Sequence, residues 1–186
     1  MRYPAEETAA RHERILDEAA RLFREQGFGG VGVAEVMRAA GLTHGAFYAH
    51  FASKDALAAA GTERAVSGTL AHLEAALRAP EPEAAFVRGY LSAAHREHPG
   101  GGCAIAALGP EVARHPAARA PFTAQVRKVL DTIAGGFRVR RDRRARAHAI
   151  HLLSTLVGAM VLARAVDDPA LSDEILAAAR ETLLSR

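Results

Sequence analysis

Residues 33–51 read VAEVMRAAGLTHGAFYAHF, and this stretch decides the fold class of the 186-residue chain. Apolar residues spaced three or four positions apart predict a short helix before the Ala-Gly-Leu turn and another helix after it. Two helices that cross at a steep angle need small side chains at their closest approach, and Ala39, Ala40 and Gly41 provide them. Leu42 fills the corner. The segment therefore has the sequence form of a helix-turn-helix.

The helix after the turn is expected to have one buried and one exposed side. Thr43 is well placed to cap it, and Phe47 and Phe51, four positions apart, are expected to share the side that faces the core. The residues left on the opposite side are Thr43, His44, Gly45 and Tyr48. A helix in a DNA major groove presents its N-terminal turn and one face to bases and phosphates. These four residues are therefore candidates for DNA contact.

Helical periodicity continues on both sides of this motif. Apolar residues recur at the spacing of one helix face over residues 8–26, and Gly27 is expected to end that helix. Ser53 is expected to cap a long helix that begins at Lys54 and stops before Pro80. The sequence shows no convincing alternating strand pattern and no internal repeat. It therefore predicts an all-α protein.

Glycines and prolines divide the second half of the chain into further helices. One is expected over residues 86–94, and a short one is expected near Cys103 with an interruption at Gly109 and Pro110. Phe122 lies in a later helix that two glycines, at 135 and 136, are expected to end. Two apolar helices then complete the chain.

Composition and charge limit the classes of function. The single Cys excludes an internal disulfide and a Cys-rich zinc finger. The N-terminus lacks an apolar segment and no long apolar stretch is free of charge, so we expect a cytoplasmic protein without a membrane span. The formal net charge is +3, but the first fifty residues contain six arginines and seven acidic residues. The DNA-binding interpretation therefore depends on the local pattern.

Residues 15–57, ILDEAARLFREQGFGGVGVAEVMRAAGLTHGAFYAHFASKDAL, resemble the N-terminal domain of TetR/AcrR-family transcriptional regulators. The matching landmarks are Leu22-Phe23, Gly27-Phe28, Ala40-Gly41-Leu42, Gly45, Phe47-Tyr48, Phe51 and Ser53-Lys54. The resemblance implies a three-helix DNA-binding domain at residues 1–53 and a helical ligand-sensing and dimerisation domain at residues 54–186. It also implies a repressor that binds a (pseudo)palindromic operator in double-stranded DNA as a homodimer and that answers to a small, hydrophobic effector.

The resemblance assigns roles to single positions. Thr43, His44, Gly45 and Tyr48 match recognition-helix positions, and His50 and Lys54 match positions that often touch the DNA backbone. Many members carry hydroxyl residues where this chain has Val31 and Gly32, so a phosphate contact there has to come from backbone N–H groups, at Gly32 and Val33. The recognition helix lacks Arg and Lys, which excludes bidentate readout of guanine from it. His44 and Tyr48 are therefore the main candidates for base contact.

Cys103 follows the sequence HPGGG and opens a predicted helix. The helix dipole favours the thiolate of a cysteine at such a position. The segment GGCAIAALGPEVAR also resembles a Gly-Cys helix start in some electrophile- and oxidant-sensing TetR-family proteins, which implies that Cys103 is a sensor. The alternative is that Cys103 is a small buried hydrophobic residue, as free cysteines often are.

The last two predicted helices, residues 146–166 and 171–185, are strongly apolar for terminal elements. Gly158 and Ala159 would allow another helix to approach closely. We expect the two helices to pair with their copies in a second subunit as a four-helix bundle, and the alternative is a core within one chain. The residues expected at this interface are Leu153, Val157, Met160, Val161, Leu171, Ile175 and Leu183.

Other patterns do not support catalysis or metal binding. His95 and His98, and likewise His148 and His151, lie three positions apart and could share a helix face, but no carboxylate accompanies them at a metal-site spacing. No nucleophile elbow, phosphate loop or dinucleotide-binding motif occurs. We therefore expect no metal, no cofactor and no enzyme activity. An all-α enzyme and a helical protein-interaction module remain the alternatives.

The stretch RVRRDRRARAH, residues 138–148, concentrates six arginines. Such a charge run is usually a solvated loop and helix start, which is the expectation here. A second contact with nucleic acid or with a partner protein is the alternative. Because this run contributes much of the chain's positive charge, that charge says little about the helix-turn-helix.

Overall fold

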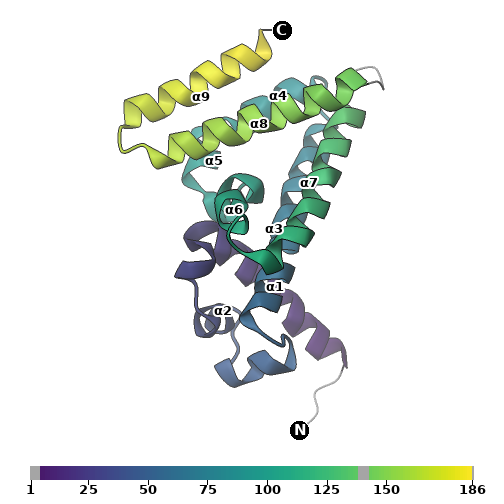
Figure 1. Cartoon of the computed structure of the whole chain (residues 1–186), viewed down its shortest axis with the longest axis vertical. Coiled ribbons are helices and arrows are strands. Elements are labelled where there is room, and N and C mark those ends of the chain that lie inside the picture. Colours follow the sequence, from purple (N-terminus) through teal and green to yellow (C-terminus); the bar gives the residue numbers. More distant parts are fainter. Residues whose placement is uncertain (1–4, 138–142, 186) are drawn as a thin grey trace.

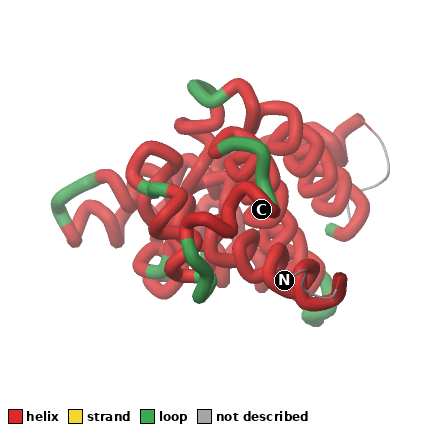
Figure 2. Tube along the Cα trace, turned by 90° about the horizontal axis from the view of Figure 1, so that it is seen from below, coloured by secondary structure: helices red, strands yellow, loops and turns green. Residues whose placement is uncertain are grey.

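The structure is a computed structural model that describes residues 5–137 and 143–185, and it confirms the predicted all-α fold (Figure 1). In chain order the elements are α1 (Ala5–Gly30), α2 (Val33–Ala39), the 3-10 helix η1 (His44–Ala49), α3 (Lys54–Ala76), α4 (Pro82–Tyr90), α5 (Ala93–Glu97), the 3-10 turn η2 (Pro99–Gly101), α6 (Ala104–Val112), α7 (Pro116–Gly136), α8 (Arg143–Ala165) and α9 (Pro169–Leu184). Short loops join these helices, and the described part of the chain contains no strand (Figure 2).

The helices form two groups at opposite ends of an elongated molecule. The N-terminal group consists of α1, α2 and η1, whereas α8 and α9 lie at the far end (Figure 1). α3 connects the two groups, because it packs against α1 and also runs beside α7. α6 lies between the groups and contacts α1, α3, α7 and α8. We call α1, α2 and η1 the N-terminal group and the helices from α4 onward the C-terminal group.

α1 consists of two helical segments that are separated at Gly27, which has φ 75° and ψ 173°. Glycine adopts this conformation without the steric cost that a Cβ atom imposes. The helix end predicted at Gly27 is thus confirmed for the first segment, and one further turn follows it. The amide of Phe28 donates a 2.6 Å hydrogen bond to the Glu111 carboxylate on α6. This bond joins the N-terminal group to the C-terminal group.

The predicted helix caps gave mixed results. Ser53 caps α3 as expected, because its hydroxyl accepts a 3.1 Å hydrogen bond from the amide of Ala56. Thr43 precedes η1, but its side chain makes no capping hydrogen bond, so that prediction was wrong. The helix after the turn is a short 3-10 helix that ends at Ala49, and Phe51 lies beyond it. Phe51 is buried nonetheless.

Two predicted helix boundaries in the second half were wrong. The helix expected over residues 86–94 is divided into α4 and α5, because the chain leaves helical geometry at Leu91 and Ser92 starts α5 as its cap. The interruption expected at Pro110 is absent, since α6 continues to Val112. Leu108 and Val112, one turn apart, are both buried, and their packing holds this segment helical despite the missing proline amide.

α8 contains a long apolar stretch. An 18-residue window within residues 144–165 has a mean hydropathy of 1.4, which is sufficient by length and composition to cross a membrane. Leu152, Leu156 and Met160 are completely buried against the rest of the chain, and α8 packs on α9, α7 and α6. A core helix of a globular protein has the same composition, so the segment is weak support for a membrane span.

Candidate functional site

η1 presents a polar face at the free end of the N-terminal group. Phe47 and Phe51 are only 2% and 6% exposed, and their stacked rings lie 5.8 Å apart, so they anchor the opposite side in the core. Tyr48 is 72% exposed. The candidate DNA-contact residues Thr43, His44, Gly45 and Tyr48 are all exposed. The division into a buried and an exposed side, predicted from the phenylalanines, is therefore present in the structure.

The start of α2 and the start of α3 flank this face in sequence. Gly32 is exposed and precedes α2 without a capping side chain, while Val33 is half-buried and packs on the core. Lys54 is exposed at the first position of α3. The structure thus leaves Gly32 and Lys54 accessible to a phosphate group, and their contact with DNA remains a prediction.

His50 has a different environment from the other candidates. It is half-buried, and its ring centroid lies 5.8 Å from that of His12, which stacks on Phe51 at 4.7 Å. Partial burial lowers the pKa of His50, and the positive charges of His12 and Arg11 lower this pKa further. His50 is therefore neutral at pH 7, and a contact with a phosphate would be a hydrogen bond from a neutral ring.

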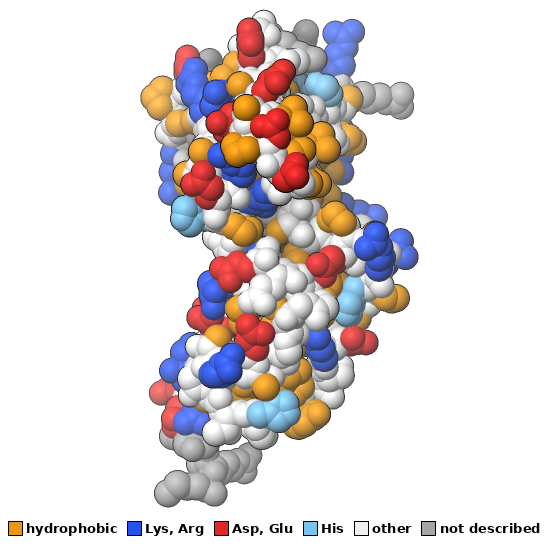
Figure 3. All heavy atoms as spheres, turned by 90° about the vertical axis from the view of Figure 1, so that its left-hand side faces the viewer, with side chains coloured by type: hydrophobic (Ala, Val, Ile, Leu, Met, Phe, Trp, Pro, Cys, Tyr) orange, Lys and Arg blue, Asp and Glu red, His pale blue; other side chains and the backbone are white. Residues whose placement is uncertain are grey.

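The surface around the helix-turn-helix is not uniformly basic. Acidic and basic side chains alternate over the face in Figure 3. Arg21 pairs with Glu18 at 2.7 Å and with Glu25 at 2.8 Å. Arg38 on α2 is exposed, and no ion pair involves it among the described residues. Sequence reasoning did not include Arg38 among the candidates for phosphate contact, although its polar position on a helix that buries Val36 and Met37 signals exposure.

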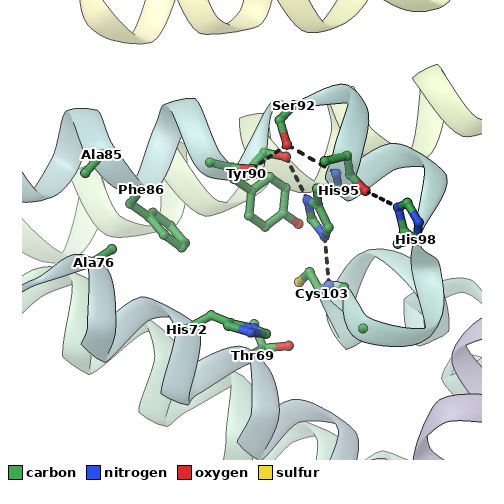
Figure 4. Close-up of a pocket in the computed structure, with 14 residues that line it drawn as sticks. Thr69, His72, Ala76, Ala85, Phe86, Tyr90, Ser92, His95, His98 and Cys103 are labelled. Atoms are coloured by element: carbon green, nitrogen blue, oxygen red, sulfur yellow. Dashed lines mark hydrogen bonds between the residues drawn. The ribbon is translucent and has the colours of Figure 1, made fainter.

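A second candidate site is a cavity of about 440 Å³ in the C-terminal group, which we call the Cys103 cavity (Figure 4). It lies between α3, α4, α5 and the turn that precedes α6. The lining residues are Thr69, His72, Ala76, Ala85, Phe86, Gly89, Tyr90, Ser92, Ala94, His95, His98, Gly101, Gly102 and Cys103. One end is apolar, and polar side chains gather at the end that holds Cys103. The volume is in the range of small-molecule sites in proteins.

Cys103 is a free, buried cysteine at the N-terminus of α6. The position at a helix start is the one predicted, and the residue is 4% exposed and lines the cavity. The Tyr90 hydroxyl faces it and has no hydrogen-bond partner in the described structure. Burial, and then the neighbouring Cys103, raise the pKa of Tyr90 well above its ordinary value. Tyr90 therefore stays protonated and can donate a hydrogen bond.

His95 connects α5 to the start of α6. Its Nδ1 donates a 2.7 Å hydrogen bond to the carbonyl oxygen of Tyr90, and its Nε2 accepts a 2.8 Å bond from the amide of Cys103. The bond that Nε2 accepts requires the neutral ring, and burial favours this form because it lowers the pKa of His95. With both nitrogens occupied, His95 has no free position for a metal or for proton transfer.

The proposed histidine pairs form no metal centre. His98 is hydrogen-bonded through Nδ1 to the carbonyl oxygen of Ala94, and His148 lies 2.9 Å from the Glu83 carboxylate on α4. Within the described ranges, no group of three or more His, Cys, Asp or Glu residues could hold a metal ion. Tyr90 and its neighbours around Cys103 were missed from sequence because they come from separate helices.

The predicted dimer residues are distributed differently from the expectation. Leu153, Met160 and Leu183 are buried within the protomer at 6%, 0% and 7% exposure, and their contact with a second subunit stays a prediction. α8 and α9 pack on each other, and this contact covers part of their apolar surface within the protomer. Val157, Val161 and Ile175 are half-buried, and Leu171 is 41% exposed. The exposed apolar residues that were not predicted are Ile150 at 47% and Leu162 at 56%.

Part of the arginine-rich run, residues 138–142, lies outside the described residues. Arg146, within the described part of the run, forms an ion pair with Asp131 on α7. This contact fits the expected solvated helix start.

Comparison with known sequences places the helix-turn-helix in one family. Residues 15–60 match the model of "Bacterial regulatory proteins, tetR family". The HTH-type transcriptional regulator YvdT of Bacillus subtilis is 31% identical over 75 residues, which are 40% of this chain and 39% of YvdT. The regulator AcrR of Shigella flexneri is 42% identical over 52 residues, 28% of this chain and 24% of AcrR. These matches span well under half of the length of either relative.

Solved structures extend the similarity to the whole chain. A TetR transcriptional regulator from Chloroflexus aurantiacus has a TM-score of 0.79 and 25% identity, covering 97% of this chain and 95% of its own. SCO4454, a TetR-family regulator from Streptomyces coelicolor, has a TM-score of 0.68 and 28% identity, with 95% of both chains covered. The reduced form of NemR from E. coli is similar in fold, with a TM-score of 0.76, 22% identity, and 95% and 96% of the two chains covered.

Proposed function

Because this chain belongs to the TetR family of transcriptional regulators, we propose that it is a cytoplasmic repressor that binds a (pseudo)palindromic operator as a homodimer. Residues 1–53 bind DNA, and residues 54–186 sense an effector and dimerise. The observation that carries the proposal is the polar face of η1, which Phe47 and Phe51 hold outward. Two such faces have to lie about 34 Å apart to enter successive major grooves.

Substitution of the proposed contacts tests this function and separates two kinds of contact. Tyr48→Ala is expected to reduce affinity for a selected operator about tenfold and to relax base preference, because a base contact contributes about 1–3 kcal/mol of discrimination. Lys54→Ala is expected to weaken binding to all duplexes and to lower the salt dependence by roughly one phosphate contact. The measurement is fluorescence anisotropy with duplexes selected from a random library, at several salt concentrations.

The chain provides a matched control for the lysine. Lys128 is exposed on α7 and is the other lysine of the sequence. Lys128→Ala should leave both the affinity and the salt dependence unchanged. If no duplex is enriched by the wild-type protein, or if Lys54→Ala and Lys128→Ala behave alike, the proposed DNA interface is wrong.

An effector in the Cys103 cavity would control DNA binding by favouring one of two conformations. A ligand shifts such an equilibrium only by its difference in affinity for the two states. α6 is suited to this role, since Cys103 precedes its first turn and Glu111, near its last turn, bonds to the amide of Phe28. A small, hydrophobic molecule in the cavity, or modification of Cys103, would displace this helix and change the separation of the two DNA-binding faces.

The sensor role of Cys103 has its own test. Iodoacetamide alkylates a thiolate: a sulfur–carbon bond forms, iodide leaves and the thiol proton passes to solvent. We expect iodoacetamide to release the wild-type protein from DNA and to leave Cys103→Ser bound, with the same affinity of both proteins for DNA before treatment. Anisotropy measures the release, and mass spectrometry confirms the modified residue. Equal release of the two proteins would show that Cys103 is only a packed core residue.

A further inference from the structure

The polar end of the Cys103 cavity has a donor without an acceptor. The Tyr90 hydroxyl is buried, since the residue is 6% exposed, and it makes no hydrogen bond within the described structure. Figure 4 shows it directed toward His95 and Cys103. The neighbouring thiol of Cys103 interacts with this hydroxyl, but a thiol sulfur is a weak acceptor and leaves the hydroxyl without a strong hydrogen bond. A buried polar group without a partner is costly, and a bound molecule with an acceptor atom would remove the cost.

The acceptors that His95 and the Tyr90 carbonyl contribute at this end of the cavity are already occupied. Nε2 of His95 accepts from the Cys103 amide, and the Tyr90 carbonyl accepts from the other ring nitrogen. The hydroxyl oxygen of Thr69 accepts a 3.0 Å bond from the amide of Ala104 and retains its own proton to donate. The donors of Tyr90 and Thr69 therefore favour a ligand with acceptor oxygens.

The charge near this end is positive. Arg164 lies close enough to Tyr90 and Cys103 to interact electrostatically with both side chains. Its Nε and Nη2 donate to the carbonyl oxygens of Arg96 and His95, whereas its buried Nη1 has no partner among the described residues. Burial lowers the pKa of Arg164, but a guanidinium remains protonated at neutral pH. None of the described residues that line the cavity is acidic.

The opposite end of the cavity is apolar. Ala76 on α3 and Ala85 and Phe86 on α4 line it, as Figure 4 shows. A hydrocarbon chain or ring would lose contact with water there and gain dispersion contacts with these side chains. The cavity therefore combines an apolar compartment with a compartment that donates hydrogen bonds and carries positive charge.

We propose that the Cys103 cavity binds a small amphipathic organic acid, whose carboxylate accepts hydrogen bonds from Tyr90 and Thr69 while its hydrocarbon body lies against Ala76, Ala85 and Phe86. The proposal rests on the proposed effector-controlled function and names the chemical class of the effector. Tyr90 is the residue that selects the head group. The nearby guanidinium of Arg164 compensates the charge that the carboxylate brings into a partly apolar site.

Calorimetric titration with three compounds of equal chain length tests the assignment. Decanoate, decanol and decylamine share one hydrocarbon body and differ in charge and in hydrogen-bond acceptors. Decanoate is expected to bind at least about tenfold more tightly than decylamine, because hydrogen bonds to a carboxylate are stronger than neutral ones and the nearby guanidinium of Arg164 repels an ammonium group. Decanol should bind with intermediate affinity.

The variant Tyr90→Phe tests whether the Tyr90 hydroxyl selects the head group of the ligand or only contributes to packing. The variant should bind decanoate about five- to tenfold more weakly, while its melting temperature without ligand stays equal or rises, because the removed hydroxyl has no partner in the free protein. Tyr48→Phe, the same change on the exposed face of η1, should leave the affinity for decanoate unchanged. These opposite effects of Tyr90→Phe on binding and on stability would not result from a purely structural role.

Three outcomes would overturn the proposal: decylamine binding as tightly as decanoate, an unchanged affinity ratio in Tyr90→Phe, or no binding of decanoate at any soluble concentration. The titration uses the protein without DNA and is independent of the repressor assay. A protein that binds decanoate but enriches no duplex would contradict the proposed function and leave this inference standing. A protein that enriches a duplex but does not discriminate between the head groups would contradict this inference alone.

Discussion

Gly27→Ala is expected to lower the free energy of unfolding by about 3 kcal/mol. This is the largest effect on stability that we predict for a glycine substitution. The backbone at Gly27, with φ 75° and ψ 173°, lies in a region that side chains with a Cβ atom avoid. An added Cβ would also lie 1.8 Å from the Glu111 carboxylate oxygen, so this side chain has to move and give up its bond to the Phe28 amide. Urea unfolding followed by circular dichroism measures the change.

Other glycines provide controls for each part of this cost. Gly29→Ala places a Cβ where no atom lies within 4 Å, and it should leave stability unchanged or raise it slightly. Gly41 has φ 72° but open space around it, so Gly41→Ala reports the backbone cost alone. Combining Gly27→Ala with Glu111→Ala removes the steric conflict, and the two effects should be less than additive. A Gly27→Ala variant as stable as Gly29→Ala would contradict the conformation at the kink.

The parts of the fold that depend on local pattern were predictable. Phe47, Phe51 and the small residues of the turn define the helix-turn-helix because each acts on neighbours within a few positions. Ser53 was recognised as a cap for the same reason. The exposed face of η1 follows from the burial of the two phenylalanines. Local signals of this kind do not depend on the rest of the chain.

The remaining features depend on contacts between distant segments. Tyr90, His95 and Arg164 surround Cys103 from three different helices, and no spacing in the sequence relates them. The buried side of α8 was hard to predict for a similar reason: the helix is apolar on most sides, so its pattern does not tell which side the neighbouring helices cover. Packing against α9, α7 and α6 leaves Met160 buried and Leu162 exposed.

The two candidate sites are joined by one short helix. α6 begins at the Cys103 cavity and carries Glu111 near its other end, where the carboxylate bonds to the Phe28 amide of the N-terminal group. Phe28 also contacts the ring of His115, which follows α6, and this ring lies near Asp55 at the start of α3. We therefore expect a displacement at one end of α6 to be transmitted to both helices that position the proposed DNA-binding face. The Gly27 kink provides the amide on which this contact depends.

Leu162→Asp is expected to convert the protein to a monomer and to reduce affinity for a palindromic operator at least about a hundredfold, because a linked second half-site raises apparent affinity by about 10²–10⁴. Leu162 is 56% exposed on α8, and Gly158, one turn before it, has open space around its Cα. An exposed apolar side chain beside a small residue suits close packing of a second copy. A carboxylate there would be buried without a partner in the dimer but would remain solvated in the monomer. Sedimentation equilibrium measures the mass, and anisotropy measures the affinity.

Two comparisons distinguish loss of dimerisation from loss of folding. Ala120→Asp adds the same charge at an exposed position of α7 and should leave both the dimer and the operator affinity unchanged. Leu162→Asp should keep the wild-type melting cooperativity and the wild-type affinity for a single half-site, since the N-terminal group is untouched. If Leu162→Asp still sediments as a dimer with unchanged operator affinity, then the exposed face of α8 is not the subunit interface. Another surface would then have to set the spacing of the two proposed DNA-binding faces. The apolar side of α8 that carries Leu153 and Met160 is already buried within the protomer, where α8 packs on α9.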